Sequence, residues 1–199
     1  MDSSIDALPQ WFGAGAPPLQ LDIGSHRGVF LAAMAARFPG TNFLGIERLS
    51  ARVDRSNAKF ARLGLANAHC LRGGGLEVLK ELPTGCAEGV HVLFPDPWPK
   101  RRHAPRRLVG PAFLEECARI LAPGGFLRIG TDDEPYARAI RLALAACPAL
   151  APGWQPPEFP PTEFERKFLA AGVAPHWVTA LRKDDGSMGL TPGNARSSG

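Results

Sequence analysis

The sequence predicts an α/β fold in which helices cover both faces of a mainly parallel sheet. Short apolar segments alternate with helical segments over most of the 199 residues, which is the pattern of repeated strand–helix units. The 22 glycines and 20 prolines suit a fold with many short, sharply turned connections. The length fits one domain of ordinary size.

The first strand–helix unit begins with the alternating segment Leu19–Ile23 and breaks at Gly24. An alanine-rich helix follows over Val29–Phe38, and Pro39 ends it. The same order repeats twice more, with strands at 42–46 and 68–71 and helices at 51–63 and 76–82.

A fourth apolar strand, Val90–Phe94, runs into three alternate prolines between Pro95 and Pro99. These prolines exclude a helix or a central strand there, because each lacks a backbone N–H. Further along, the pattern predicts a helix at 111–121, a tight turn at 123–125, a fifth strand at 126–131, a helix at 135–146, a proline-rich loop at 148–161, a short helix from about Thr162 and a last strand at 176–182.

These elements define the domain organisation. Residues 1–18 are rich in Gly and Pro and are expected to form a flexible arm whose hydrophobic anchor is Trp11–Phe12. Residues 19–183 form the single domain. Residues 184–199 are rich in Gly and Ser and are expected to be a disordered tail.

Several classes of protein are excluded. No run approaches 18 apolar residues, so no membrane span is expected. The N-terminus has no Lys or Arg before Arg27, which argues against a signal peptide and favours a cytoplasmic protein. The four cysteines are far apart and indicate reduced thiols, and neither they nor the five histidines have the spacing of metal ligands.

Charge is concentrated in one segment. The net charge is +4, and the eight residues from Lys100 to Arg107 hold five positive charges and no negative one. Such a focused patch is typical of a protein that binds a polyanion. A solvated basic loop is the alternative.

A cofactor site is predicted where the first two strands end. Gly24 and Gly28 follow the first strand, and Glu47 closes the second strand 25 residues after Asp22. A glycine loop lets a ligand approach the backbone, and a carboxylate after the second strand can accept both hydroxyls of a ribose. A purely structural strand-to-helix turn is the alternative.

The ligand is expected to be S-adenosylmethionine. A dinucleotide fingerprint aligned on Gly24 needs glycine at positions that His26 and Val29 occupy, so an NAD oxidoreductase is disfavoured. Asp22 would repel a phosphate but suits a cation. S-adenosylmethionine has a ribose, no phosphate and a positively charged sulfonium and ammonium.

The segment LFPDPWPKRRH, residues 93–103, together with Arg106 and Arg107 resembles the signature of bacterial tRNA (guanine-N7)-methyltransferases. The resemblance continues through Pro123–Gly125, Thr131–Asp132 with Tyr136, and 162–168, and it covers about residues 19–183. It implies a Rossmann-like class I methyltransferase. The sheet would have seven strands, mostly parallel with the last strand antiparallel, and the enzyme would modify a guanine in the variable loop of tRNA.

The resemblance also implies roles for individual residues. Asp22, Glu47 and Asp96 would bind the cofactor, with Asp96 also at the catalytic position. The residues implied on the substrate side are Lys100, Asp132, Thr162, Glu163, Phe164 and Glu165. The charge argument adds phosphate contacts for Lys100, Arg101, Arg102, Arg106 and Arg107.

Three positions depart from the family pattern. His26 replaces a glycine of the first loop, Asp133 replaces an aromatic residue, and Gly74 stands on the cofactor side where an acidic residue usually contacts the adenine. Two alternatives therefore stay open, namely a catalytically weakened relative that binds tRNA and a methyltransferase of another substrate. The sequence leaves open whether the protein is a monomer or a homodimer.

Overall fold

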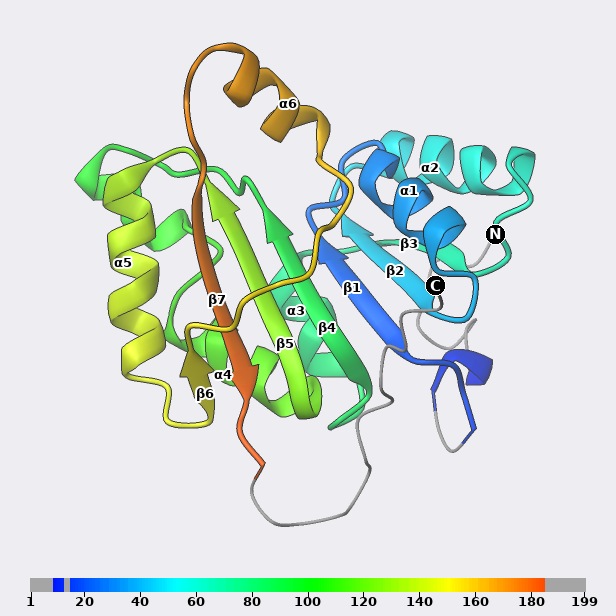
Figure 1. Ribbon diagram of the computed structural model, residues 1–199, viewed down its shortest axis with the longest axis horizontal. Helices are drawn as coiled ribbons and strands as arrows, with labels where there is room; N and C mark the ends of the chain where they lie inside the picture. Colours follow the sequence, from blue (N-terminus) through cyan, green and yellow to red (C-terminus); the bar gives the residue numbers. More distant parts are fainter. Residues whose placement is uncertain (1–8, 13–14, 185–199) are drawn as a thin grey trace.

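The structure is a computed structural model that describes residues 9–12 and 15–184. These residues form one seven-stranded sheet with strand order β3-β2-β1-β4-β5-β7-β6 (Figure 1). Every strand is parallel to its neighbours except β7, which is antiparallel to both β5 and β6. The strands are β1 Leu19–Ile23, β2 Asn42–Glu47, β3 Ala68–Arg72, β4 Ala87–Leu93, β5 Leu121–Thr131, β6 Leu150–Pro152 and β7 His176–Arg182.

Helices cover both faces of the sheet, as the alternating pattern predicts. The described part of the chain has six α-helices: α1 Val29–Arg37, α2 Ser50–Arg62, α3 Gly75–Glu81, α4 Pro111–Ile120, α5 Glu134–Ala145 and α6 Glu163–Ala170. One apolar core joins the sheet to α3, α4 and α5, and a second joins it to α1 and α2. The predicted fold class is therefore confirmed.

The two faces of the sheet differ in chemistry. Leu21, Val90 and Leu127 are register neighbours on β1, β4 and β5, and all three are buried in the larger core. The next residue of each strand faces the opposite way, and there the register neighbours are Asp22, His91 and Arg128. One face is thus apolar, and the other carries a row of polar side chains.

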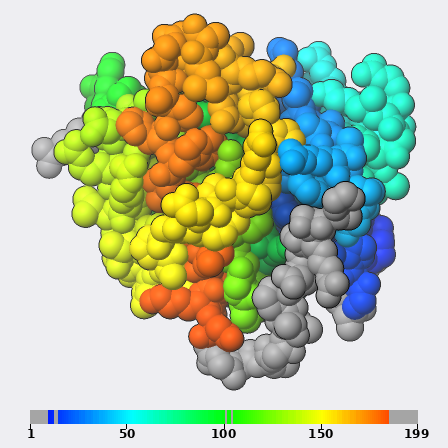
Figure 2. Space-filling view, viewed as in Figure 1, coloured from blue at the N-terminus to red at the C-terminus, as the bar shows by residue number. Residues whose placement is uncertain are grey.

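An extended segment covers part of the polar face. Residues 153–161, which we call the strap, run from β6 to α6 and cross the sheet in front of β5 and β4 (Figures 1 and 2, yellow). The Trp154 ring stacks on Phe126 with centroids 4.5 Å apart, and Phe159 packs edge-on against His91 at 5.1 Å. The strap holds α6 above the carboxyl ends of the strands.

Most predicted elements agree with the structure to within a few residues, but one does not. The predicted loop at 148–161 contains β6, the seventh strand that the residue pattern misses. The turn predicted at Pro123–Gly125 falls within the bounds of β5, but the register with β4 jumps from Leu121 to Phe126 there and Gly124 has a positive φ, so the chain bends sharply at this point. The basic segment after Pro99 forms a short 3₁₀ helix, Arg101–Arg106.

The N-terminal arm is anchored at Trp11. Pro9–Trp11 form a 3₁₀ turn, and the Trp11 side chain is buried and meets the edge of the His69 ring at 6.4 Å. The rest of the flexible-arm prediction, at residues 1–8 and 13–14, and the predicted tail after Asp184 lie outside the described residues. Within the described ranges, no helix has the length and apolar character to cross a membrane.

Candidate active site

A cleft of about 1160 Å³ opens at the carboxyl ends of β1 to β4. Parallel strands bring these ends to one edge of the sheet, where ligands of open α/β folds bind. The cleft is lined by Ile23, Gly24, His26, Ile46, Glu47, Arg48, Leu49, Arg52, Gly73, Gly74, Gly75, Leu76, Glu77, Leu93, Phe94, Pro95, Asp96, Trp98, Arg106, Arg107, Leu108 and Phe164.

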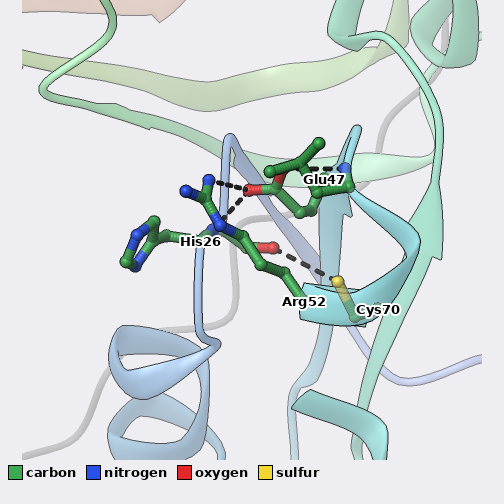
Figure 3. A network of polar contacts seen from close by, with 6 residues as sticks. His26, Glu47, Arg52 and Cys70 are labelled. Atoms are coloured by element: carbon green, nitrogen blue, oxygen red, sulfur yellow. Dashed lines mark hydrogen bonds and ion pairs between the residues drawn. The ribbon is translucent and has the colours of Figure 1, made fainter. Parts of the chain in front are cut away.

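Glu47 is held firmly at one side of this cleft (Figure 3). One carboxylate oxygen accepts the His26 backbone N–H at 3.1 Å and faces the Arg52 guanidinium at 3.5 Å. The other oxygen accepts the Leu49 backbone N–H at 3.0 Å. These bonds close the glycine loop onto the end of β2 and fix a negative charge at the cleft.

Asp22 lies below the glycine loop and is 3% exposed. Burial raises the pKa of its carboxyl to about 7, an effect that Glu47 increases and Arg128 opposes. Asp22 lines a small cavity beside the main cleft together with Leu93, Thr162, Glu163 and Phe164. A cation bound there would favour the ionised form of Asp22.

The backbone is strained around the cleft. Among the described residues, His26, Phe94 and Trp98 are the non-glycine residues with positive φ, at 52°, 56° and 44°. All three line the cleft. Left-handed backbone is rare for such bulky residues, and strain of this kind gathers at functional sites.

The two loop glycines have different roles. Gly24 has φ +84° and open space where a Cβ would lie, so a ligand can approach its backbone. Gly28 has φ +61°, but a Cβ there would meet the Phe60 ring at 2.8 Å and Ser56 at 2.9 Å. Gly28 therefore lets α1 and α2 pack closely and lies away from the cleft lining.

A wall of three glycines, residues 73–75, forms the far side of the cleft beyond β3. A side chain at Gly74 would run into the carboxylate of Glu77, which is exposed and also lines the cleft. Sequence reasoning missed Glu77, because a glutamate in the first turn of a helix looks like an ordinary surface residue.

Asp96 follows β4 between Pro95 and Pro97 and is exposed in the cleft. Flanking prolines restrict the backbone on both sides, so the carboxylate has a defined place. Asp132, at the end of β5, is exposed outside the cleft lining.

Helix α6 lies across the mouth of the site. The Thr162 hydroxyl accepts the Glu165 N–H at 2.9 Å and the Glu165 carboxylate accepts the Thr162 N–H at 3.2 Å, so both side chains cap the helix. Phe164 packs edge-on against His26 at 5.6 Å and also meets Phe94 at 6.5 Å. Of the predicted segment 162–165, Phe164 lines the cleft, and Thr162, Glu163 and Phe164 line the small cavity beside it.

The basic segment borders the cleft on the β4 side. Lys100, Arg102 and Arg106 are exposed, and Arg106 lies 5.1 Å from the centre of the Trp98 ring. Arg107 donates to Pro97 O at 2.8 Å and stacks on the ring of buried Tyr136 at 4.9 Å, so it ties this loop to α5. The side chain of Arg101 lies outside the described part of the structure.

The structure brings together Gly24, Glu47, Gly74 and Asp96 in the main cleft and Asp22 in the adjoining cavity. The described residues contain no group of three side chains suited to a metal ion, and all four cysteines are free thiols.

Comparison with known proteins places this arrangement in a family. The family model Methyltransf_4, described as "Putative methyltransferase", matches residues 16–177. The chain is 37% identical over 186 residues to a tRNA (guanine-N(7)-)-methyltransferase of Rhodospirillum rubrum, covering 87% of this chain and 73% of that protein. It is 42% identical over 163 residues to the Treponema pallidum (strain Nichols) protein of the same name, covering 80% of this chain and 65% of the relative.

Solved structures support the fold. The aminoglycoside resistance methyltransferase NpmB1 matches with a TM-score of 0.61 and 18% identity, over 83% of this chain and 87% of that one. A SAM dependent methyltransferase from Aquifex aeolicus matches with a TM-score of 0.60 and 17% identity, over 89% of this chain and 88% of that one. The chain therefore has the class I methyltransferase fold, and it spans about two thirds to three quarters of the length of the two relatives, from 65% to 73%.

Replacing Asp22 by Asn should stabilise the protein in a pH-dependent way. The Asp22 pKa rises from 3.8 to about 7 on folding, so its contribution to stability is fully present below pH 3.8 and is lost as pH rises to 7. A neutral Asn avoids this loss. We expect Asp22→Asn to be more stable than wild type at pH 8 by on the order of a few kcal/mol and equal near pH 4.

Urea unfolding at a series of pH values measures this difference. Asp54→Asn, at an exposed position of α2, is the matched control and should leave the pH profile unchanged. An Asp22→Asn variant that is less stable than wild type at pH 8 would contradict a net free-energy cost of ionising Asp22 in the folded protein.

Proposed function

Because the chain belongs to the Methyltransf_4 family of methyltransferases, we propose that it transfers the methyl group of S-adenosyl-L-methionine to N7 of a guanine in the variable loop of tRNA. The observation that carries this proposal is the 37–42% identity to tRNA (guanine-N(7)-)-methyltransferases over most of the chain. The enzyme would be cytoplasmic, where its substrate is made, and a monomer or a homodimer.

The cleft has the groups that this cofactor needs. Glu47 can accept the two ribose hydroxyls, since the backbone bonds already aim its carboxylate at the cleft. Asp22 offers a negative charge to the cationic methionine end, and the backbone of Gly24 allows close approach. When bound, S-adenosylmethionine supplies an activated methyl group on its sulfonium.

Glu77 is the residue that we assign to the base of the cofactor. The wall at 73–75 carries no side chains, so a flat ring can lie against it. An adenine amino group donates hydrogen bonds, and the Glu77 carboxylate occupies the space beside Gly74 where an acceptor is needed. Glu77 would thereby replace the acidic residue that the family pattern has at position 74.

Asp96 is the proposed catalytic residue. Guanine N7 has an in-plane lone pair and no proton to remove, so methylation needs alignment and electrostatic stabilisation rather than a general base. An exposed carboxylate held between two prolines in the cleft can accept from the guanine edge. It also balances the positive charge that the ring gains. Asp132 would bind the substrate from the rim beyond the cleft.

The basic segment would bind the tRNA backbone. Lys100, Arg102 and Arg106 are exposed beside the cleft and can contact phosphates, as can Arg101. The contacts of Arg107 with Pro97 and Tyr136 favour a supporting role, in which it holds the loop in place. Residues 162–165 would meet the substrate from the opposite side, through α6.

A catalytically weakened relative is the second candidate. His26 favours it, because this side chain lines the cleft from a left-handed backbone position that suits glycine. The two candidates share tRNA binding and differ in cofactor binding and turnover.

The test is methyl transfer to bulk tRNA from labelled S-adenosylmethionine, followed by identification of the modified nucleoside. We expect 7-methylguanine, and we expect Asp96→Ala to slow its formation by about 10²–10³-fold with the fold intact. Circular dichroism and cofactor titration serve as controls. An Asp96→Ala enzyme with near wild-type turnover would remove this residue from the mechanism, and tRNA binding without product would favour the weakened relative.

The role of the basic segment is tested by the salt dependence of tRNA binding. Each phosphate contact adds about −0.7 to −0.9 to the slope of log affinity against log salt. Arg102→Gln and Arg106→Gln should each flatten this slope by nearly one unit. Arg141→Gln, an equal charge change at an exposed position of α5, is the matched control. Slopes equal to wild type in both test variants would show that the loop is merely solvated.

A further inference from the structure

Three ionisable side chains form a buried row on the polar face of the sheet. Asp22 on β1 is the register neighbour of His91 on β4, and His91 is the register neighbour of Arg128 on β5. Neighbours in register project to the same face, so the three side chains lie side by side beneath α1 and the strap. Their exposed fractions are 3%, 1% and 5%.

Arg128 is the unusual member of this row. Its Nε and Nη1 atoms are buried and have no hydrogen-bond partner among the described residues. The guanidinium lies 3.9 Å from the centre of the Trp177 ring and 5.0 Å from that of Phe159 in the strap. Contact with aromatic faces offsets only part of the cost of burying a charge. A nearby negative group would offset the remaining free-energy cost of burying the Arg128 charge.

Glu165 of α6 is the first such group, and Asp22 is the second. Neighbouring strands lie about 4.8 Å apart, so two positions separated by one strand are about 10 Å apart, and charges interact over that distance when water is excluded. The intervening His91 is neutral, since burial and Arg128 hold its pKa well below the usual value. Its Nε2 is bonded to Gln20 at 3.1 Å, and Gln20 in turn donates to Glu88.

The other ionisable groups around the row do not supply a positive charge to Asp22. Glu47 is negative and raises the Asp22 pKa, and burial keeps Cys70 a neutral thiol with a pKa of about 12. Glu165 acts on Arg128 from α6 while its carboxylate caps that helix. Arg128 itself stays protonated at neutral pH, because burial lowers its pKa only to about 10.

We propose that Arg128 is a positioning residue of the cofactor site, whose buried charge acts across neutral His91 to keep Asp22 a carboxylate beneath the glycine loop. This inference rests on the proposed function, in which Asp22 meets the cationic end of S-adenosylmethionine. It accounts for a buried guanidinium that has two nitrogens without a hydrogen-bond partner among the described residues. It also explains how a carboxyl group so shielded from water can still bind a cation.

The inference is tested with Arg128→Met, which keeps much of the packing and removes the charge, and with Arg128→Gln as a second neutral variant. Arg128→Lys retains the charge. Thr179→Val is the matched control for packing, because Thr179 is the register neighbour of Arg128 and its hydroxyl donates to Trp154 O of the strap. The titration of the Asp22 carboxyl carbon is followed by NMR, and S-adenosylmethionine affinity is measured by calorimetry across the same pH range.

We expect the pH midpoint of the Asp22 titration to rise by about one pH unit or more in the neutral variants. In Arg128→Lys and Thr179→Val this midpoint should stay near the wild-type value. Cofactor affinity at pH 7 should fall by up to about tenfold in the neutral variants, and the difference should shrink at high pH, where Asp22 ionises in all proteins. If Arg128 only supported the packing, its replacement would leave the titration midpoint of Asp22 unchanged.

An unchanged midpoint in a folded neutral variant, or an equal shift in Thr179→Val, would overturn the inference. A wild-type protein that binds no S-adenosylmethionine would overturn the proposed function and the cofactor part of this inference with it. The NMR midpoint would still decide whether Arg128 controls the charge of Asp22.

Discussion

The parallel pairing of β1 with β2 and β4 is the constraint on which the site depends. The register sets Ile23 beside Ile46, so Glu47 ends β2 next to the point where the chain leaves β1 at Gly24. The loop can then close through the His26 N–H onto Glu47. A shift of one residue in β1 would turn Asp22 toward the apolar core, because side chains alternate along a strand.

The different chemistry of the two faces of the sheet follows from this register. The face toward α3, α4 and α5 is apolar and contributes the larger core. The opposite face carries the buried row of Asp22, His91 and Arg128, which lowers stability but places charge beneath the cleft. The strap covers this row with aromatic rings and at the same time positions α6 over the cleft entrance.

Much of the fold and part of the candidate site could be predicted from the sequence. The strands at 19–23 and 176–182 agree with the predicted bounds, because alternation and flanking glycine or proline mark them clearly. The strand β6 was missed because it has three residues and ends in a proline, so no local pattern distinguishes it from a loop. Its pairing with β7 is a tertiary effect.

The candidate site could also be predicted only in part from the sequence. Asp22 and Glu47 lie at the ends of β1 and β2, Asp96 follows β4, and all three could be placed from their position alone. The placement of Gly28 under α2 and the part that Glu77 takes in the cleft depend on how helices pack, which residue types do not reveal. The burial of Arg128 could not be predicted from the sequence either. A single arginine in a strand usually points to solvent, and only the register and the strap show that this one is buried.

The central claim is that the cleft at the ends of β1 to β4 holds S-adenosylmethionine. A crystal structure of the complex with S-adenosylhomocysteine tests it most directly. We expect the ribose hydroxyls on Glu47, the amino group near Asp22, and the adenine against residues 73–75 with its amino group at Glu77. A ligand bound elsewhere, or a cleft that stays empty at saturating ligand, would contradict the account.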